Sequence, residues 1–123
     1  MKINIVEREG YSNRLVCRNG NYMAEAPDGR PGFEDEGYLA LFGDDGIFVE
    51  SNMIKLRSLN PAAYAVTQEQ EIGAALQCLS RKEGIPYAMI NFEVFNRNRK
   101  WSDEDITLLT LLGHCIGELL CRI

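Results

Sequence analysis

Positive charge is scarce in this sequence. Its 123 residues include 13 Lys and Arg against 18 Asp and Glu, so the formal net charge is -5 and the pI is near 4.9. The one basic cluster, at residues 97–100, is followed at once by acidic residues at 103–105. Nucleic-acid surfaces need gathered Lys and Arg to neutralise phosphates. The sequence therefore argues against a nucleic-acid partner.

Closely spaced cysteines are also lacking. The four Cys are Cys17, Cys78, Cys115 and Cys121, without a C-x-x-C pair, which excludes the usual zinc and thioredoxin-like motifs. Each lies among apolar neighbours, so we expect reduced thiols packed in a core. We predict neither a metal nor another bound cofactor.

Long apolar runs are absent as well. A membrane-spanning helix needs about 20 apolar residues, which no stretch approaches, and the opening MKINIVEREG lacks the apolar core of a signal peptide. We therefore expect a cytoplasmic chain without a membrane partner. With 123 residues, 46% of them apolar, residues 1–123 have the size of one domain that buries about two thirds of its unfolded surface.

Apolar residues that are present alternate as they do in strands. Four segments, at 2–8, 11–18, 72–80 and 86–96, predict a central antiparallel sheet, and GIFVES at 46–51 predicts a further short strand. The last two long strands are apolar at nearly every position, so we expect both of their faces to be covered. RKEG at 81–84 predicts a four-residue turn between them.

Between the two predicted hairpins, the sequence changes character several times. Residues 21–37 are rich in Pro and Gly and predict a surface loop. Residues 33–42 predict a short helix, and Asn60 followed by Pro61 predicts the start of another over 61–72. Residues 51–60 do not favour one structure.

The chain closes on a long amphipathic helix, predicted over 102–122. Ser102 and Asp105 have the spacing of a capping box, in which each side chain accepts a hydrogen bond from the other's backbone N–H. The apolar positions cover far more than one stripe, so the helix needs two partners: its own sheet and a second helix. The apolar positions that repeat at spacings of three and four are Leu109, Leu112, Ile116, Leu119 and Ile123, and the apolar surface is widened by Leu108, Leu111, Cys115 and Leu120.

Four stretches carry a resemblance to a known family: YSNRLVCRNG, LALFGDDGIFVE, QEIGAALQC and NRKWSDEDITLLTLLGHCIGELL. Together they resemble GAF domains, small sensory domains, and in particular those that precede GGDEF (cyclic-di-GMP signalling) modules in clostridia-like bacteria. The resemblance covers most of residues 2–123 and is best over 70–120. It implies an α+β fold, a GAF-like central antiparallel sheet flanked by helices, with the terminal helix on one face and residues 20–70 on the other.

The resemblance also implies a function in signal transduction. A GAF domain of this type is a non-catalytic sensory module that binds a small ligand or a partner and signals through its terminal helix to an output domain, here a diguanylate cyclase of the parent protein. Against the family, we expect the helix before the first strand and the output domain after Ile123 to be missing. The alternatives are a dimerisation or docking module without a ligand and, third, a small thiol-dependent redox enzyme.

In GAF-like folds the ligand pocket lies between the sheet and the segment corresponding to 20–66. Its aromatic residues are equally compatible with a plain core. Glu93 is either solvent-facing or a paired buried carboxylate, and the alternation leaves both open. The candidate pocket residues are Tyr22, Tyr38, Phe42, Phe48, Tyr64, Cys17, Cys78, Asn91 and Glu93.

Two motifs in the terminal helix require a choice between interpretations. Adjacent residues on a helix diverge by about 100°, so His114 and Cys115 do not make a catalytic pair, and we expect a buried Cys115 beside a partly exposed His114. Gly113 and Gly117 predict close packing against a neighbour, with a dimer seam as the sharper hypothesis. We expect a homodimer through Leu109, Leu112, Gly113, Ile116, Gly117, Leu119 and Ile123.

Overall fold

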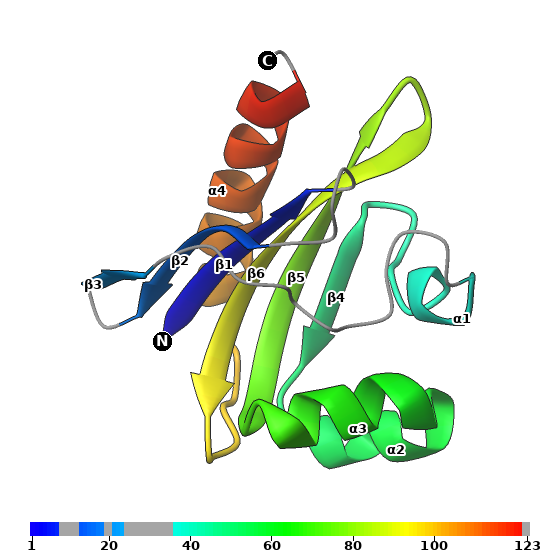
Figure 1. Cartoon of the computed structure of the whole chain (residues 1–123), viewed down its shortest axis with the longest axis vertical. Coiled ribbons are helices and arrows are strands. Elements are labelled where there is room, and N and C mark those ends of the chain that lie inside the picture. Colours follow the sequence, from blue (N-terminus) through cyan, green and yellow to red (C-terminus); the bar gives the residue numbers. More distant parts are fainter. Residues whose placement is uncertain (8–12, 19–20, 24–35, 122–123) are drawn as a thin grey trace.

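Six antiparallel strands form a single sheet with helices on both faces (Figure 1). The computed structural model describes residues 1–7, 13–18, 21–23 and 36–121. The strand order is β3-β2-β1-β6-β5-β4. The strands are β1 (Lys2–Glu7), β2 (Asn13–Arg18), β3 (Asn21–Met23), β4 (Ile47–Glu50), β5 (Ile72–Lys82) and β6 (Ile85–Phe95).

The four long strands confirm the predicted sheet, and β4 confirms the short strand at its edge. The predicted four-residue turn is wrong. β5 continues to Lys82 and β6 begins at Ile85, so only Glu83 and Gly84 form the turn, with φ of 55° and 81°. Two positive φ values match the twist of a two-residue hairpin, and Gly84 supplies one of them without strain. The short strand β3 was not predicted, because it lies at the start of the expected loop.

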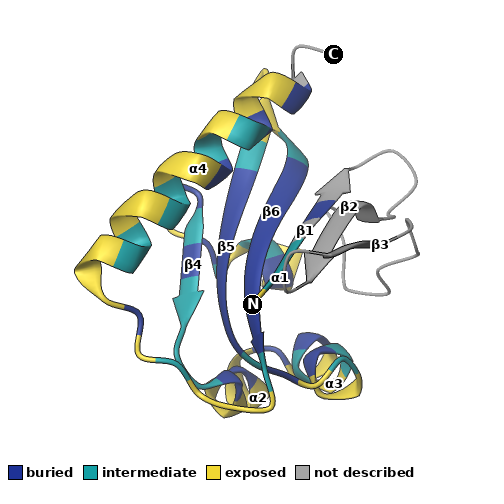
Figure 2. Ribbon diagram, turned by 90° about the vertical axis from the view of Figure 1, so that its left-hand side faces the viewer, coloured by how far each residue is buried: buried dark blue, intermediate teal, exposed yellow. Residues whose placement is uncertain are grey.

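The terminal helix α4 (Asp103–Cys121) covers one face of the sheet, as predicted (Figure 2). Its capping box is confirmed: the Ser102 Oγ accepts from the Asp105 N–H at 3.0 Å, and the Asp105 Oδ2 accepts from the Ser102 N–H at 3.2 Å. Arg99 also pairs with Asp105 at 3.1 Å. Of the described residues, no helix is both long and apolar enough to cross a membrane.

The opposite face carries α1 (Glu36–Leu39), the 3-10 helix η1 (Met53–Lys55), α2 (Leu56–Leu59) and α3 (Pro61–Glu69). The short helix and the helix after Asn60 are therefore confirmed, and the undecided segment is helical. The Asn60 Oδ1 caps α3 by accepting from the Ala63 N–H at 3.1 Å. The predicted helix extended too far, because α3 ends at Glu69 and β5 begins at Ile72.

Strand alternation divides β5 and β6 between two cores, which confirms that both faces are covered. On the α4 side, the buried residues include Leu76, Cys78, Ile90 and Phe92. Position-by-position alternation sends the intervening residues to the other side, where Ala75, Leu79 and Met89 pack with the helices.

Candidate functional site

A row of buried polar side chains crosses β5 and β6. Gln77, Asn91 and Glu93 are 3%, 1% and 0% exposed. They alternate with Cys78, Ile90 and Phe92, which pack on the α4 side, so the row faces the opposite layer. Gln77 and Asn91 are direct partners across the two strands. Polar groups at this depth are usually retained for a specific interaction.

The row is only partly satisfied by the described residues. The Tyr38 hydroxyl donates to the Gln77 Oε1 at 2.7 Å across the buried interface. The Oδ1 of Asn91 is buried and has no hydrogen-bond partner within the described part of the chain. A buried acceptor without a partner costs about 1–3 kcal/mol, so this atom marks a place where a ligand or water would bind. The Glu93 alternatives are resolved in favour of burial.

The predicted aromatic pocket residues gather on the same side of the sheet as this row. Tyr38, Phe42 and Phe48 are all buried and pack on one another, with ring centroids 5.9 Å apart for the first pair and 6.1 Å for the second. Tyr64 is partly buried and packs against the same core. The structure thus brings these four aromatic residues together as a packed cluster on the face of the sheet opposite α4, where the pocket was predicted. The side chains of Cys17 and Tyr22 lie outside the described residues.

Cys78 does not belong with the other pocket candidates. It is fully buried on the α4 side of the sheet, because it alternates with Gln77 along β5. Burial is the main cause that raises the pKa of its thiol to about 12, with the nearby Asp45 carboxylate adding to the effect. At neutral pH this cysteine is a protonated, inert core residue.

The two glycines of α4 face the sheet and not a partner helix. A Cβ on Gly113 would lie 2.5 Å from the Cys78 Sγ, and a Cβ on Gly117 would overlap Ser80. Leu109 and Ile116 also pack against this core. These four residues hold α4 on its own sheet, in agreement with the packing interpretation of the two glycines, and their expected place in a dimer seam stays a prediction. Ile123 lies outside the described residues.

The outer face of α4 exposes a continuous apolar surface, which we call the α4 stripe. The exposed fractions are 65% for Leu108, 62% for Leu111, 44% for Leu112 and 62% for Leu119, and Cys115 is exposed between them. The expectation of a buried Cys115 is therefore wrong, because the inner face of the helix is set by the glycines two positions away on either side. Leu112 and Leu119 remain available for the predicted dimer.

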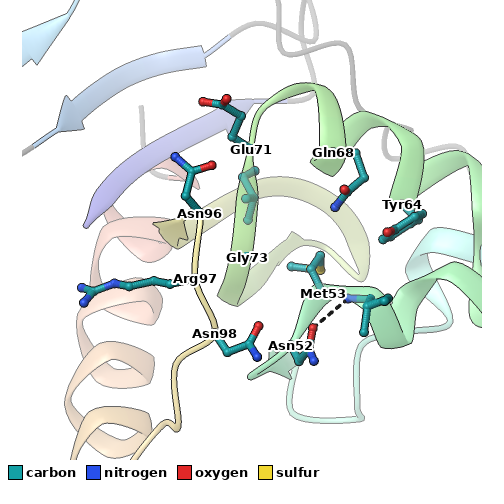
Figure 3. Close-up of a pocket in the computed structure, with 11 residues that line it drawn as sticks. Asn52, Met53, Tyr64, Gln68, Glu71, Gly73, Asn96, Arg97 and Asn98 are labelled. Carbon is teal, nitrogen blue, oxygen red and sulfur yellow. Dashed lines mark hydrogen bonds between the residues drawn. The ribbon is translucent and has the colours of Figure 1, made fainter.

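The structure also contains a concave site that was not predicted from the sequence. It is a cleft of about 360 Å³ between the start of η1, α3 and the segment after β6 (Figure 3). We call it the amide cleft, because amide side chains from three separate segments line it. The only sequence signal was the frequency of Asn and Gln around the loops. The cleft is lined among others by Asn52, Met53, Tyr64, Gln68, Asn96 and Asn98.

His114 is half-buried and lies beside the exposed Cys115. No group of three or more His, Cys, Asp or Glu side chains is placed to hold a metal ion among the residues that the structure describes. Among the described residues, His114 therefore has no neighbouring side chains with which it could bind a metal ion.

Solved structures match this arrangement of sheet and helices over almost the whole chain. A GAF domain from Synechocystis, solved in its photoproduct state, is 10% identical with a TM-score of 0.60, over 98% of this chain and 82% of its own. The fold is that of a GAF domain. A domain of a two-component sensor histidine kinase protein from Sinorhizobium meliloti is 11% identical with a TM-score of 0.59, over 99% of this chain and 79% of its own.

A third structural neighbour of this GAF fold holds a ligand. It is a far-red absorbing dark state with bound biliverdin, 13% identical with a TM-score of 0.63, over 98% of this chain and 79% of its own. At these identities the likeness concerns the fold. No protein-family model and no curated protein matches the sequence.

Proposed function

We propose that this chain is a cytoplasmic sensory domain that binds a small ligand or a partner and passes the signal through α4 to an output domain. The observation that carries the proposal is the division of α4 into two apolar faces. One packs on the sheet through Gly113 and Gly117, and the other is the exposed α4 stripe. A helix with two apolar faces joins its own domain to a second surface.

A second copy of α4 is the partner that fits the stripe. Leu108, Leu112, Cys115 and Leu119 follow the 4-3-4 spacing of a two-stranded coiled coil. Residues 106–117 contain no Asp, Glu, Lys or Arg, whereas a helix face in water is normally charged. In a two-fold symmetric dimer the same apolar residues cover each other. The working form is thus a homodimer with parallel α4 helices.

The input lies on the opposite face of the strands that carry α4. Gln77 of the polar row directly precedes Cys78, against which Gly113 packs. A ligand that binds Asn91 or Gln77 and favours one strand position therefore also favours one position of α4. Such coupling requires two states with different affinity for the ligand.

The output domain is proposed from the resemblance to GAF domains that precede GGDEF modules. In the parent protein, α4 would lead toward a diguanylate cyclase that works as a dimer, while this domain itself performs no chemistry. The biliverdin-bound neighbour shows that this kind of fold accommodates a small molecule in another protein. The residues of the polar row indicate the class of ligand that would bind there. Such a ligand carries a hydrogen-bond donor for the Asn91 Oδ1.

Sedimentation velocity tests the dimer. The wild-type chain should sediment as a dimer at micromolar concentration, and Leu112→Asp and Leu119→Asp should be monomers that keep the native circular dichroism spectrum. Thr107→Asp is the matched control, because Thr107 is exposed on α4 but lies off the stripe. A folded wild-type monomer at all concentrations would overturn the proposal.

A docking module without a ligand is the second candidate, and the packing of Tyr38, Phe42 and Phe48 favours it. Thermal-shift screening with a metabolite panel separates the two, because a ligand at 100 times its dissociation constant adds about 2.7 kcal/mol of stability. The sensory proposal expects a ligand whose shift is lost in Asn91→Leu. If no metabolite raises the melting temperature, the result would favour the docking module over the sensory domain.

A further inference from the structure

We infer that the amide cleft is a binding site for a small uncharged ligand that carries a carboxamide group. The cleft is separate from the polar row, because it opens at the end of the sheet where β6 finishes and β5 begins (Figure 3). A volume of about 360 Å³ falls within the range of small-molecule sites. The binding step does not depend on the proposed function.

Hydrogen-bonding groups in the cleft are available to a ligand. The side chains of Tyr64, Gln68, Asn96 and Asn98 form no hydrogen bond with any described residue. The Asn52 Oδ1 accepts from the Ile54 N–H at 3.2 Å, and the Asn52 side-chain N–H groups donate to no described residue. Figure 3 shows Asn52 and Asn98 on one side of the cleft, Gln68 and Tyr64 on the other, and Met53 between them.

The chemistry of these groups selects the ligand. A side-chain amide both donates and accepts, so it pairs best with a partner that does the same in one plane, which is what a carboxamide does. Two charged residues, Glu71 and Arg97, also line the cleft, but their side chains point away from its centre (Figure 3). Met53 and Ile72 supply a buried apolar floor for the body of the ligand.

The backbone around the cleft is held in an unusual conformation. Glu71 and Asn96 have φ of 60° and 57°, in the left-handed region, and the Asn96 N–H donates to the Glu71 carbonyl at 2.8 Å. Gly73 allows the backbone of Arg97 to approach, because a Cβ there would overlap the Arg97 carbonyl. Strained positions of this kind collect at binding sites, where they fix the groups before the ligand arrives.

The cleft also includes part of the segment that leads into α4. Asn98 lies on the segment between β6 and α4, and this segment is anchored by the Arg99 N–H to the Ser51 carbonyl at 3.0 Å and by the Trp101 Nε1 to the Glu50 carbonyl at 3.1 Å. A ligand that holds Asn98 against Asn52 would restrain this segment and the start of α4. This last step rests on the proposed function.

Nicotinamide and nicotinate are the matched probes, because they differ only in carboxamide against carboxylate. In two-dimensional NMR, nicotinamide should shift the side-chain NH₂ signals of Gln68 and Asn98, and nicotinate should bind at least about fivefold more weakly through the loss of one matched hydrogen bond. Equal or tighter binding of nicotinate would overturn the inference, since it would indicate an anion site at Arg97. Binding of neither probe would also overturn it.

Variants localise the binding. Gln68→Ala and Asn98→Ala should each weaken nicotinamide binding about fivefold or more, whereas Glu69→Ala, the exposed neighbour on α3 outside the cleft, should not. Unchanged affinity in both cleft variants would contradict the site. The monomeric Leu112→Asp chain should still bind nicotinamide, so the cleft and the dimer can fail separately.

Discussion

Gly113 of α4 lies directly against Cys78 of β5. A Cβ at position 113 would be 2.5 Å from the Cys78 Sγ and 2.9 Å from its Cβ, closer than van der Waals contact permits. The glycine therefore fixes how near the terminal helix approaches the sheet, and it links the helix to the strand that carries Gln77 on its other face.

Substituting this glycine should destabilise the fold although alanine favours a helix. Gly113→Ala gains about 1 kcal/mol of helix propensity but overpacks the core, which typically costs about 1–3 kcal/mol. We expect net destabilisation by up to about 2 kcal/mol in urea unfolding. Thr107→Ala on the exposed side of α4 is the control, and it should be neutral or stabilising. A more stable Gly113→Ala chain would show that the helix does not approach the sheet so closely.

The capping box at the start of α4 should matter for stability. Ser102→Ala removes the acceptor for the Asp105 N–H and should cost about 1 kcal/mol. Ser58→Ala is the comparison, because Ser58 is exposed and its hydroxyl makes only a long 3.4 Å bond to the Lys55 carbonyl. Equal losses in both variants, measured by urea unfolding, would indicate that the cap contributes nothing specific.

The same cap should make stability depend on pH. The hydrogen bond from Arg99, followed by that from the Ser102 backbone, lowers the pKa of Asp105. A carboxyl with a lowered folded pKa stabilises the fold above its unfolded value, near 4, and this contribution is lost as pH falls through the folded pKa. The stability difference between wild type and Asp105→Asn should therefore be largest near pH 6 and shrink below pH 4. A constant difference between pH 6 and pH 2.5 would contradict this.

The turn between β5 and β6 offers a test of backbone strain alone. Gly84 has φ of 81°, and a Cβ there would meet nothing within 4 Å. Gly84→Ala should cost about 1–2 kcal/mol through its left-handed conformation, without any steric contact. Glu83→Asn, at φ 55°, should be neutral or stabilising, because Asn tolerates this region. A stable Gly84→Ala variant would argue against the two-residue turn.

The two cysteines whose side chains the structure describes should differ in reactivity. Cys115 is exposed, whereas Cys78 is buried with a thiol pKa raised to about 12, and the thiolate is the reactive form. Iodoacetamide followed by peptide mapping should find Cys115 modified in the native protein and Cys78 modified only after unfolding. Rapid alkylation of native Cys78 would revive the redox-enzyme hypothesis.

Local sequence signals predicted the elements that depend on local chemistry. Ser102 and Asp105 cap α4, Asn60 caps α3, and the apolar strands β5 and β6 are covered on both faces. The spacing of apolar residues could not show which face of α4 packs on the sheet, because apolar residues surround most of the helix. Only contact with the sheet decides that Gly113 faces inward and Cys115 outward.

The candidate site was predicted less completely. Asn91 and Glu93 were identified because they interrupt an apolar strand, but Gln77 was missed although it is the partner of Asn91 across β5 and β6. The amide cleft was missed for a different reason. Asn52, Gln68 and Asn98 come from segments far apart in the sequence, and they meet only because the chain after β6 crosses the start of β5.

Cross-linking at Cys115 tests the pairing of α4 helices most directly. In a parallel dimer the two Cys115 side chains of the stripe face each other across the seam, so mild oxidation of a chain with Cys17 and Cys121 replaced by Ser should yield a disulfide-linked dimer. The product should disappear in Cys115→Ser and in Leu112→Asp. If Cys115 reacts fully with maleimide but oxidation gives no Cys115–Cys115 dimer, the α4 stripe is not a parallel homodimer seam.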